Sequence, residues 1–75
     1  EELIMKTKKW LGSKPTSCNI CGASIEESFI DGRLAEHGSW AIMCELCHKV
    51  YGVGLGLGKG QLYRLNKEEW IKVGG

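Results

Sequence analysis

Two pairs of cysteines constrain the fold of this chain more than any other feature of its sequence. The pairs are Cys-Asn-Ile-Cys at residues 18–21 and Cys-Glu-Leu-Cys at residues 44–47, and 22 residues lie between them. Two residues between cysteines allow a tight turn, here called a knuckle, that directs both sulfur atoms at one point. Two facing knuckles make the four-thiolate tetrahedral site that structural zinc prefers. We therefore predict one structural Zn²⁺ ion, bound by Cys18, Cys21, Cys44 and Cys47.

The short length of the chain is a second reason to expect a metal. At 75 residues there is room for one domain, and a core of that size rarely contributes more than about 3–5 kcal/mol. The alternative is a disulfide scaffold, for which four cysteines allow three connectivities. The sequence shows neither a secretion signal nor an apolar membrane span, so we expect a reducing cytoplasm, where paired knuckles hold metal.

A site of four thiolates predicts a scaffold and not a catalyst. Catalytic zinc keeps one coordination position open for water or substrate, and four cysteines fill all of them. His48, directly after Cys47, is an alternative fourth ligand, and His37 is a more distant one. With the four cysteines as ligands, we expect a protein that is not an enzyme.

Charge is distributed unevenly along the chain. The formal net charge is +1, but residues 22–48 hold five acidic residues against one arginine, a net charge of −4. Residues 1–21 carry +2 and residues 49–75 carry +3. Nucleic-acid-binding domains are usually strongly basic overall, so this composition allows basic patches but not a broad electrostatic footprint.

The expected fold class is a small, zinc-stabilised α+β domain of the zinc-ribbon or treble-clef kind, with a β-hairpin between the knuckles and short terminal helices. Residues 1–17 are predicted as an amphipathic helix, over 3–11, with a linker, and residues 18–75 as a single zinc-binding domain. Asp31-Gly32 predicts the hairpin turn between strands 28–30 and 39–43, and a turn or two of helix is expected over 48–51. A strand is expected over 61–65. Asn66 and Glu69 form a capping signature that predicts a helix over 67–73. Trp10, Trp40 and Trp70 are predicted core anchors.

Residues 52–60 have glycine at every second position. The favoured interpretation is a loop whose glycines take special dihedral angles, and the alternative is a bare backbone surface for binding. No phosphate-loop or dinucleotide template fits the segment, so no nucleotide cofactor is expected. The residues around its end could contact a phosphate or a base. These candidate partner-binding residues are Lys59, Gln61, Tyr63 and Arg64.

Two resemblances follow from these motifs. The knuckle that enters a helix at residues 44–48 resembles the second half of treble-clef zinc fingers, including the HNH nucleases. Those enzymes take their general base from an Asp-His pair on the preceding hairpin, whereas Asp31 here is followed by glycine. From Cys18 to about Tyr63, the motifs Phe-Ile-Asp-Gly (29–32), Gly-Ser-Trp-Ala (38–41), Met-Cys-Glu-Leu-Cys-His (43–48), Tyr-Gly-Val-Gly-Leu-Gly (51–56) and Gly-Lys-Gly-Gln (58–61) resemble small zinc-ribbon proteins of tailed bacteriophages and prophages. That resemblance implies a bacterial cytoplasmic setting and a role in phage takeover of the host.

The function predicted from the sequence is a non-enzymatic structural-zinc module that binds a macromolecular partner, with no membrane involved. A host or phage protein and a nucleic acid, the latter bound through the basic glycine-rich segment 52–64, both remain open as partners. A degenerate HNH-type nuclease with His37 or His48 as base is the enzymatic alternative. A further alternative is a piece of a larger complex without activity of its own.

Overall fold

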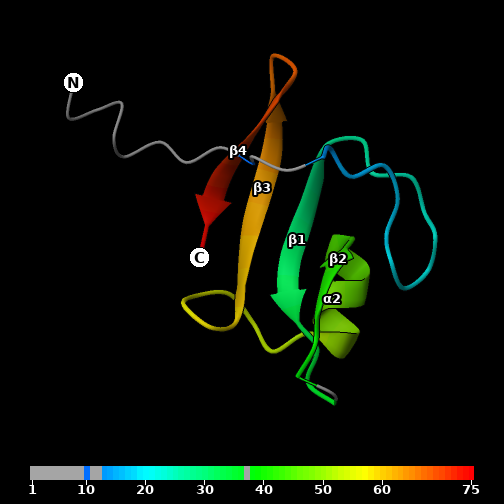
Figure 1. Cartoon of the computed structure of the whole chain (residues 1–75), viewed down its shortest axis with the longest axis vertical. Helices are drawn as coiled ribbons and strands as arrows, with labels where there is room; N and C mark the ends of the chain where they lie inside the picture. Colours follow the sequence, from blue (N-terminus) through cyan, green and yellow to red (C-terminus); the bar gives the residue numbers. More distant parts are fainter. Residues whose placement is uncertain (1–9, 11–12, 37) are drawn as a thin grey trace.

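The computed structural model describes residue 10, residues 13–36 and residues 38–75. Along the chain it has strand β1 (Ser28–Arg33), strand β2 (Trp40–Met43), helix α2 (Glu45–Tyr51), strand β3 (Gly60–Asn66) and strand β4 (Glu69–Gly74) (Figure 1). The four strands form one antiparallel sheet in the order β2-β1-β3-β4. This is a small α+β fold. Apart from Trp10, the helix predicted over residues 3–11 lies outside the described residues, and within them no helix has the length and apolar character to cross a membrane.

The hairpin between the two knuckles is present, but its turn is not at Asp31-Gly32. Both residues lie inside β1, where Asp31 pairs with Ile42 and Gly32 pairs with Ala41, and the chain reverses only after β1 ends. Gly32 has a packing role at this position. A Cβ atom there would lie 3.1 Å from Met43 Cε and 3.3 Å from the His48 ring. The glycine makes room for core packing instead of a turn.

The helix predicted over residues 67–73 is also wrong, because this segment is the edge strand β4. Lys67 and Glu68 form a two-residue hairpin turn in the left-handed region, with φ angles of 52° and 71°. Trp70 then pairs with Leu65 across the hairpin and is buried. Burial of that indole in the sheet outweighs the local capping signature, since tertiary packing routinely overrides propensity.

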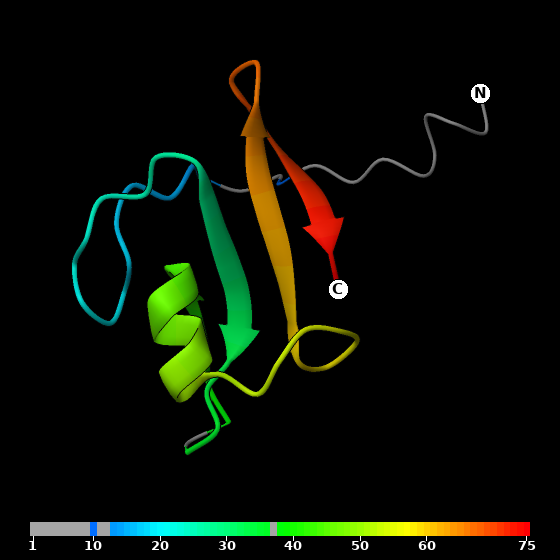
Figure 2. The ribbon, with the colours of Figure 1, turned by 180° about the vertical axis from the view of Figure 1, so that it is seen from behind.

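One face of the sheet is covered by α2, which contacts β1 and β2 and lies in front of them when the molecule is seen from behind (Figure 2). The side chain of Met43 is fully buried between these layers, against the buried Cys18 and Cys47. Leu34, Ala41 and Cys44 pack around this group. Three of the four knuckle cysteines are therefore part of the apolar core, whereas Cys21 is exposed.

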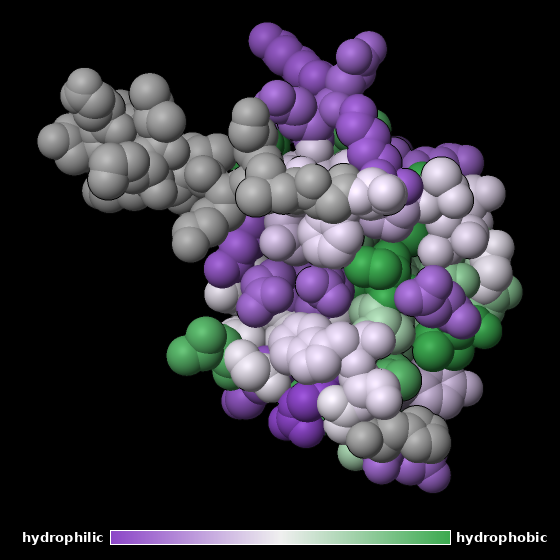
Figure 3. Space-filling model, viewed as in Figure 1, coloured by the Kyte–Doolittle hydropathy of each residue, from purple (hydrophilic) through white to green (hydrophobic). Residues whose placement is uncertain are grey.

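Four aromatic side chains pack on the opposite face of the sheet. Phe29 is fully buried and lies between Trp10, Tyr63 and Trp70, with ring centroids at 5.2, 5.1 and 4.9 Å. Trp70 is 6% exposed, which confirms the prediction that it is a core anchor, and Trp10 is half-buried. Trp40 lies at the end of the edge strand β2 and is 46% exposed, so the prediction that it is a core anchor was wrong. Figure 3 shows this face, where apolar residues gather mainly toward the side of the knuckles.

Candidate metal centre

The four cysteines of the two knuckles come together at one point. The sulfur atoms of Cys18, Cys21, Cys44 and Cys47 all lie within 4.8 Å of one another. The Sγ atoms of Cys21 and Cys44 are 3.9 Å apart, and no disulfide joins the cysteines. A regular tetrahedron of Zn–S bonds of about 2.3 Å places its sulfurs roughly 3.8 Å apart. The cluster therefore fits a four-coordinate metal ion with small adjustments of the side chains.

The first knuckle is built by backbone hydrogen bonds around Cys18. Its N–H donates to Ala23 O (2.9 Å), and its carbonyl accepts from Gly22 N (3.0 Å). Gly22 has a φ of 81°, a conformation that favours glycine. Asn19 fastens the turn to β2, because its N–H donates to Ile42 O and its Oδ1 accepts from Ile42 N, both at 2.8 Å. The knuckle is thus fixed beside the strand that leads to Cys44.

The second knuckle is the start of α2. Cys44 is the N-cap of the helix, and its Sγ accepts a hydrogen bond from Cys47 N at 3.5 Å. One helical turn then returns Cys47 to the side of Cys44, so both sulfurs face the first knuckle. The helix begins at Glu45, three residues before the start expected from the sequence. The Glu45 carboxylate joins this end of the helix to β1, because its Oε2 accepts a hydrogen bond from the Ser28 hydroxyl at 2.6 Å.

Two of the four thiols have pKa values shifted in opposite directions. Burial is the largest single influence on Cys18 and raises its pKa, but hydrogen bonds to its sulfur outweigh burial and lower the pKa to about 6. They come from the backbone N–H groups of Cys21, Cys44 and Ile20 and from the Cys47 side chain. Burial, followed by the neighbouring sulfurs, raises the pKa of Cys47. A bound divalent cation favours the thiolate form of every ligand. A metal would therefore displace the proton that burial otherwise holds on Cys47.

His48 does not belong to the sulfur cluster. Its Nε2 lies 2.9 Å from Gly54 O, and since a carbonyl only accepts, Nε2 carries the proton in this contact. The imidazole packs against Gly52, where a Cβ would overlap the ring and lie 2.8 Å from His48 O. His48 therefore holds the glycine-rich segment against the end of α2. His37, the other histidine considered as a ligand, lies outside the described residues.

The glycine-rich segment at residues 52–60 is a loop, as the favoured interpretation predicted. Gly54, Gly56 and Gly58 have φ angles of 107°, 130° and 75°, which other residues rarely adopt. Arg33 fastens the loop to the sheet, because its backbone N–H donates to Lys59 O (2.9 Å) and its Nε donates to Gly58 O (3.0 Å). The alternating glycines serve the shape of this connection.

The candidate partner-binding residues do not share one surface. Gln61 and Tyr63 pair with Asp31 and Phe29, so they lie on the sheet face away from α2, whereas Arg64 pairs with Ser28 on the α2 side. Lys59 is exposed in the glycine loop, and Tyr63 is half-buried in the aromatic group. Burial and the nearby Asp31 raise the pKa of Tyr63.

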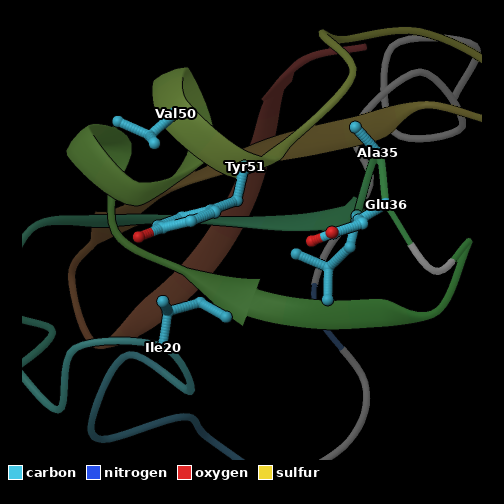
Figure 4. Close-up of a pocket in the computed structure, with 6 residues that line it drawn as sticks. Ile20, Ala35, Glu36, Val50 and Tyr51 are labelled. Atoms are coloured by element: carbon cyan, nitrogen blue, oxygen red, sulfur yellow. The ribbon is translucent and has the colours of Figure 1, made fainter.

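A groove beside the metal centre was not foreseen from the sequence. It has a volume of about 580 Å³ and is lined by Ile20, Leu34, Ala35, Glu36, Val50 and Tyr51. Its walls come from the first knuckle, from the turn after β1 and from the end of α2 (Figure 4). Ile20, an apolar residue between the two cysteines of the first knuckle, is the one local hint in the sequence, and it does not reveal the other walls of the groove.

Comparisons with known proteins identify neither the fold nor the site. No protein-family model, curated protein or solved structure matches this chain. The resemblance to phage zinc-ribbon proteins therefore stays a prediction, and the function has to be inferred from the geometry.

Proposed function

We propose that this chain is a non-enzymatic structural-zinc module that binds a macromolecular partner. The observation that carries the proposal is the convergence of four cysteine sulfurs within 4.8 Å of one another. Four thiolates complete the tetrahedral coordination of zinc, so the ion keeps no position to polarise a substrate or activate water. The remaining role of the ion is to hold two knuckles and the hairpin between them in one shape.

A protein is the partner that the surface supports best. The basic side chains diverge, since Arg64 is on the α2 side of the sheet, Lys72 is on the opposite face with Tyr63, and Lys67 is at the tip of a hairpin. Phosphate recognition needs such charges gathered on one face. Among the described residues, four exposed large apolar side chains, by contrast, lie on α2 and the knuckles: Ile20, Leu46, Val50 and Tyr51. The resemblance to phage zinc-ribbon proteins adds a bacterial cytoplasmic setting and a host protein as target.

The test is affinity capture from bacterial lysate on the zinc-loaded chain, with and without nuclease treatment and across a range of salt. We expect a captured protein whose yield survives nuclease and changes little with salt, because a protein contact with an apolar centre is weakly screened. Nucleic-acid binding would instead fall by orders of magnitude between about 50 and 200 mM salt. Capture that is lost on nuclease treatment and falls steeply with salt would contradict a protein partner.

The same material tests whether the chain lacks enzymatic activity. The imidazole of His48 is engaged with Gly54 and packed on Gly52, so we expect no cleavage of plasmid DNA or RNA with added magnesium. Cleavage that co-purifies with the chain and disappears in a His48→Ala or His37→Ala variant would overturn the non-enzymatic assignment.

A further inference from the structure

Exposed apolar side chains surround the metal centre. Both knuckles carry an apolar residue at their third position, and these side chains, Ile20 and Leu46, are 40% and 74% exposed. Val50 lies one helical turn after Leu46 and is 70% exposed, and Tyr51 is 49% exposed. Single exposed apolar residues are ordinary, but a contiguous group of them marks an interaction site. The groove lined by Ile20, Val50 and Tyr51 lies within this group.

The walls of the groove are fixed by backbone contacts before any partner arrives. Ala35 N donates to Tyr51 O at 2.8 Å, and Leu34 pairs with Gly52, so the turn after β1 is attached to the end of α2. Ile20 is held by its N–H contact to Cys18 Sγ at 3.4 Å. Because the knuckle positions Ile20, a metal that joins the two knuckles also sets the width of the groove.

The charges around the groove select its occupant. Glu36 lines the groove itself (Figure 4), and a separate hollow beside Leu46, at the start of α2, is lined by Glu26, Glu27 and Glu45. Four thiolates with one Zn²⁺ add a net charge of about −2. Lys49 is the one lysine or arginine on α2. The complement of this surface is a set of apolar side chains with positive charges beside them.

We propose that this groove docks a protein segment that presents two or three apolar side chains flanked by lysine or arginine. The proposal rests on the proposed function, for which it names the binding surface and the chemistry of the partner. Val50 and Tyr51 contact the apolar side chains together with Ile20, and Glu36 faces a basic residue at the rim. An amphipathic helix laid into an apolar groove is an established mode of such recognition.

The experiment titrates two synthetic amphipathic peptides into the zinc-loaded full chain and follows its backbone amide shifts by NMR. The peptides share the same leucine positions, and one has lysine and the other glutamate on the polar face. We expect saturable shifts centred on residues 20, 34–36 and 50–51 with the lysine peptide and at least about fivefold weaker binding of the glutamate peptide. Val50→Ser should weaken the lysine peptide about fivefold to tenfold, and Glu36→Lys should reverse the preference.

Leu57→Ser is the matched control, because Leu57 is 97% exposed in the glycine loop and outside the groove. It should bind the lysine peptide as the parent chain does. Because Glu36, Val50 and Leu57 are all exposed, thermal melts of the three variants should show an intact fold. Equal affinity for both peptides, shifts without saturation, or shifts on the aromatic face would overturn the proposal. Reversible self-association abolished by Val50→Ser would overturn it in favour of a second copy as occupant.

Failure of this proposal is distinguishable from failure of the proposed function. If the lysine peptide does not bind but zinc is retained and nuclease-resistant capture persists, the groove assignment alone is wrong. If an oligonucleotide shifts the groove residues and the peptides do not, the partner is a nucleic acid, and both the groove proposal and the preference for a protein partner fall. Loss of bound zinc from the parent chain would remove the scaffold on which both depend.

Discussion

Adding one methyl group at Gly52 is the sharpest perturbation of the contact between α2 and the glycine loop. A Cβ atom at this position would overlap His48 Cδ2 and lie 2.8 Å from His48 O and 2.9 Å from His48 Nε2. The imidazole would have to leave its place and give up its contact with Gly54 O, now 2.9 Å long. The backbone of Gly52 itself is in an extended conformation, with φ −88° and ψ 179°, so alanine meets no dihedral strain there.

The magnitude follows from these contacts. Overpacking costs about 1–3 kcal/mol, and the lost hydrogen bond costs about 1 kcal/mol. The smaller entropy of the unfolded alanine chain returns about 0.4–1 kcal/mol. We expect Gly52→Ala to lower the free energy of unfolding by about 1–3 kcal/mol, which for a domain of this size is a fall in Tm of roughly 5–20 °C. Thermal unfolding of the zinc-loaded chain, followed by circular dichroism, measures it.

A double-mutant cycle with His48→Ala attributes the effect to the imidazole. Without the ring, the methyl group at residue 52 meets only the carbonyl of residue 48, so its effect should shrink by about 1 kcal/mol or more. His48→Ala should also retain one zinc ion, because His48 contacts the loop and not the cysteine cluster. Neutral behaviour of Gly52→Ala, full additivity with His48→Ala, or loss of zinc in the histidine variant would each refute this reasoning.

Three further predictions concern the hairpin turn, the half-buried carboxylate of Asp31 and the candidate metal ligands. Lys67→Asn combined with Glu68→Gly should raise the free energy of unfolding, measured by chemical denaturation, by about 1–2 kcal/mol. Lys67 and Glu68 have left-handed φ angles of 52° and 71°, which asparagine and glycine adopt more readily. An unchanged denaturation midpoint would mean that the turn is unstrained. Burial raises the pKa of Asp31 in the folded state above its ordinary value of 3.8. Between the ordinary pKa and the raised one, the folded state binds more protons than the unfolded state, so stability falls as pH rises. Asp31→Asn should therefore raise Tm at neutral pH and lose this advantage as the pH is lowered toward 3.8, and an advantage that persists in acid would contradict a charge effect. Cys44→Ser should abolish stoichiometric zinc and unfold the domain by circular dichroism, since structural zinc contributes about 10–16 kcal/mol of apparent binding free energy; a cooperative melt without metal would contradict that dependence.

The clustering of the four cysteines was predictable from the sequence because most of the information is local. Two residues between cysteines dictate a turn that brings their sulfurs together, whatever surrounds them. The strand leading to Cys44 and the strand at Gly60–Asn66 were predictable for a similar reason, since Trp40, Ile42 and Tyr63 are residue types that favour strands. The glycine loop followed from the spacing of residues that tolerate positive φ angles.

The errors arose where tertiary packing decides the local structure. Asp31-Gly32 is a strong turn signal, but both residues are paired inside β1, where a Cβ atom at Gly32 would press on Met43 and His48. The capping signature at Asn66 indicated a helix, and burial of Trp70 against Phe29, with ring centroids 4.9 Å apart, holds the segment as a strand. Neither contact is visible in a window of neighbouring residues.

The groove could not be predicted because it joins three separate segments. Ile20, Glu36 and Tyr51 belong to the first knuckle, the turn after β1 and the end of α2. Their meeting depends on the register of β1 with β2, in which Arg33 pairs with Trp40, and on the attachment of Ala35 to Tyr51.

The central claim is that one ion joins the two knuckles through four sulfurs, and X-ray absorption at the zinc edge, together with elemental analysis of the purified chain, tests it most directly. The account predicts one zinc per chain with a shell of four sulfur atoms at about 2.3 Å. A chain without stoichiometric metal, cysteines oxidised in pairs, or a shell that contains nitrogen or oxygen would contradict it.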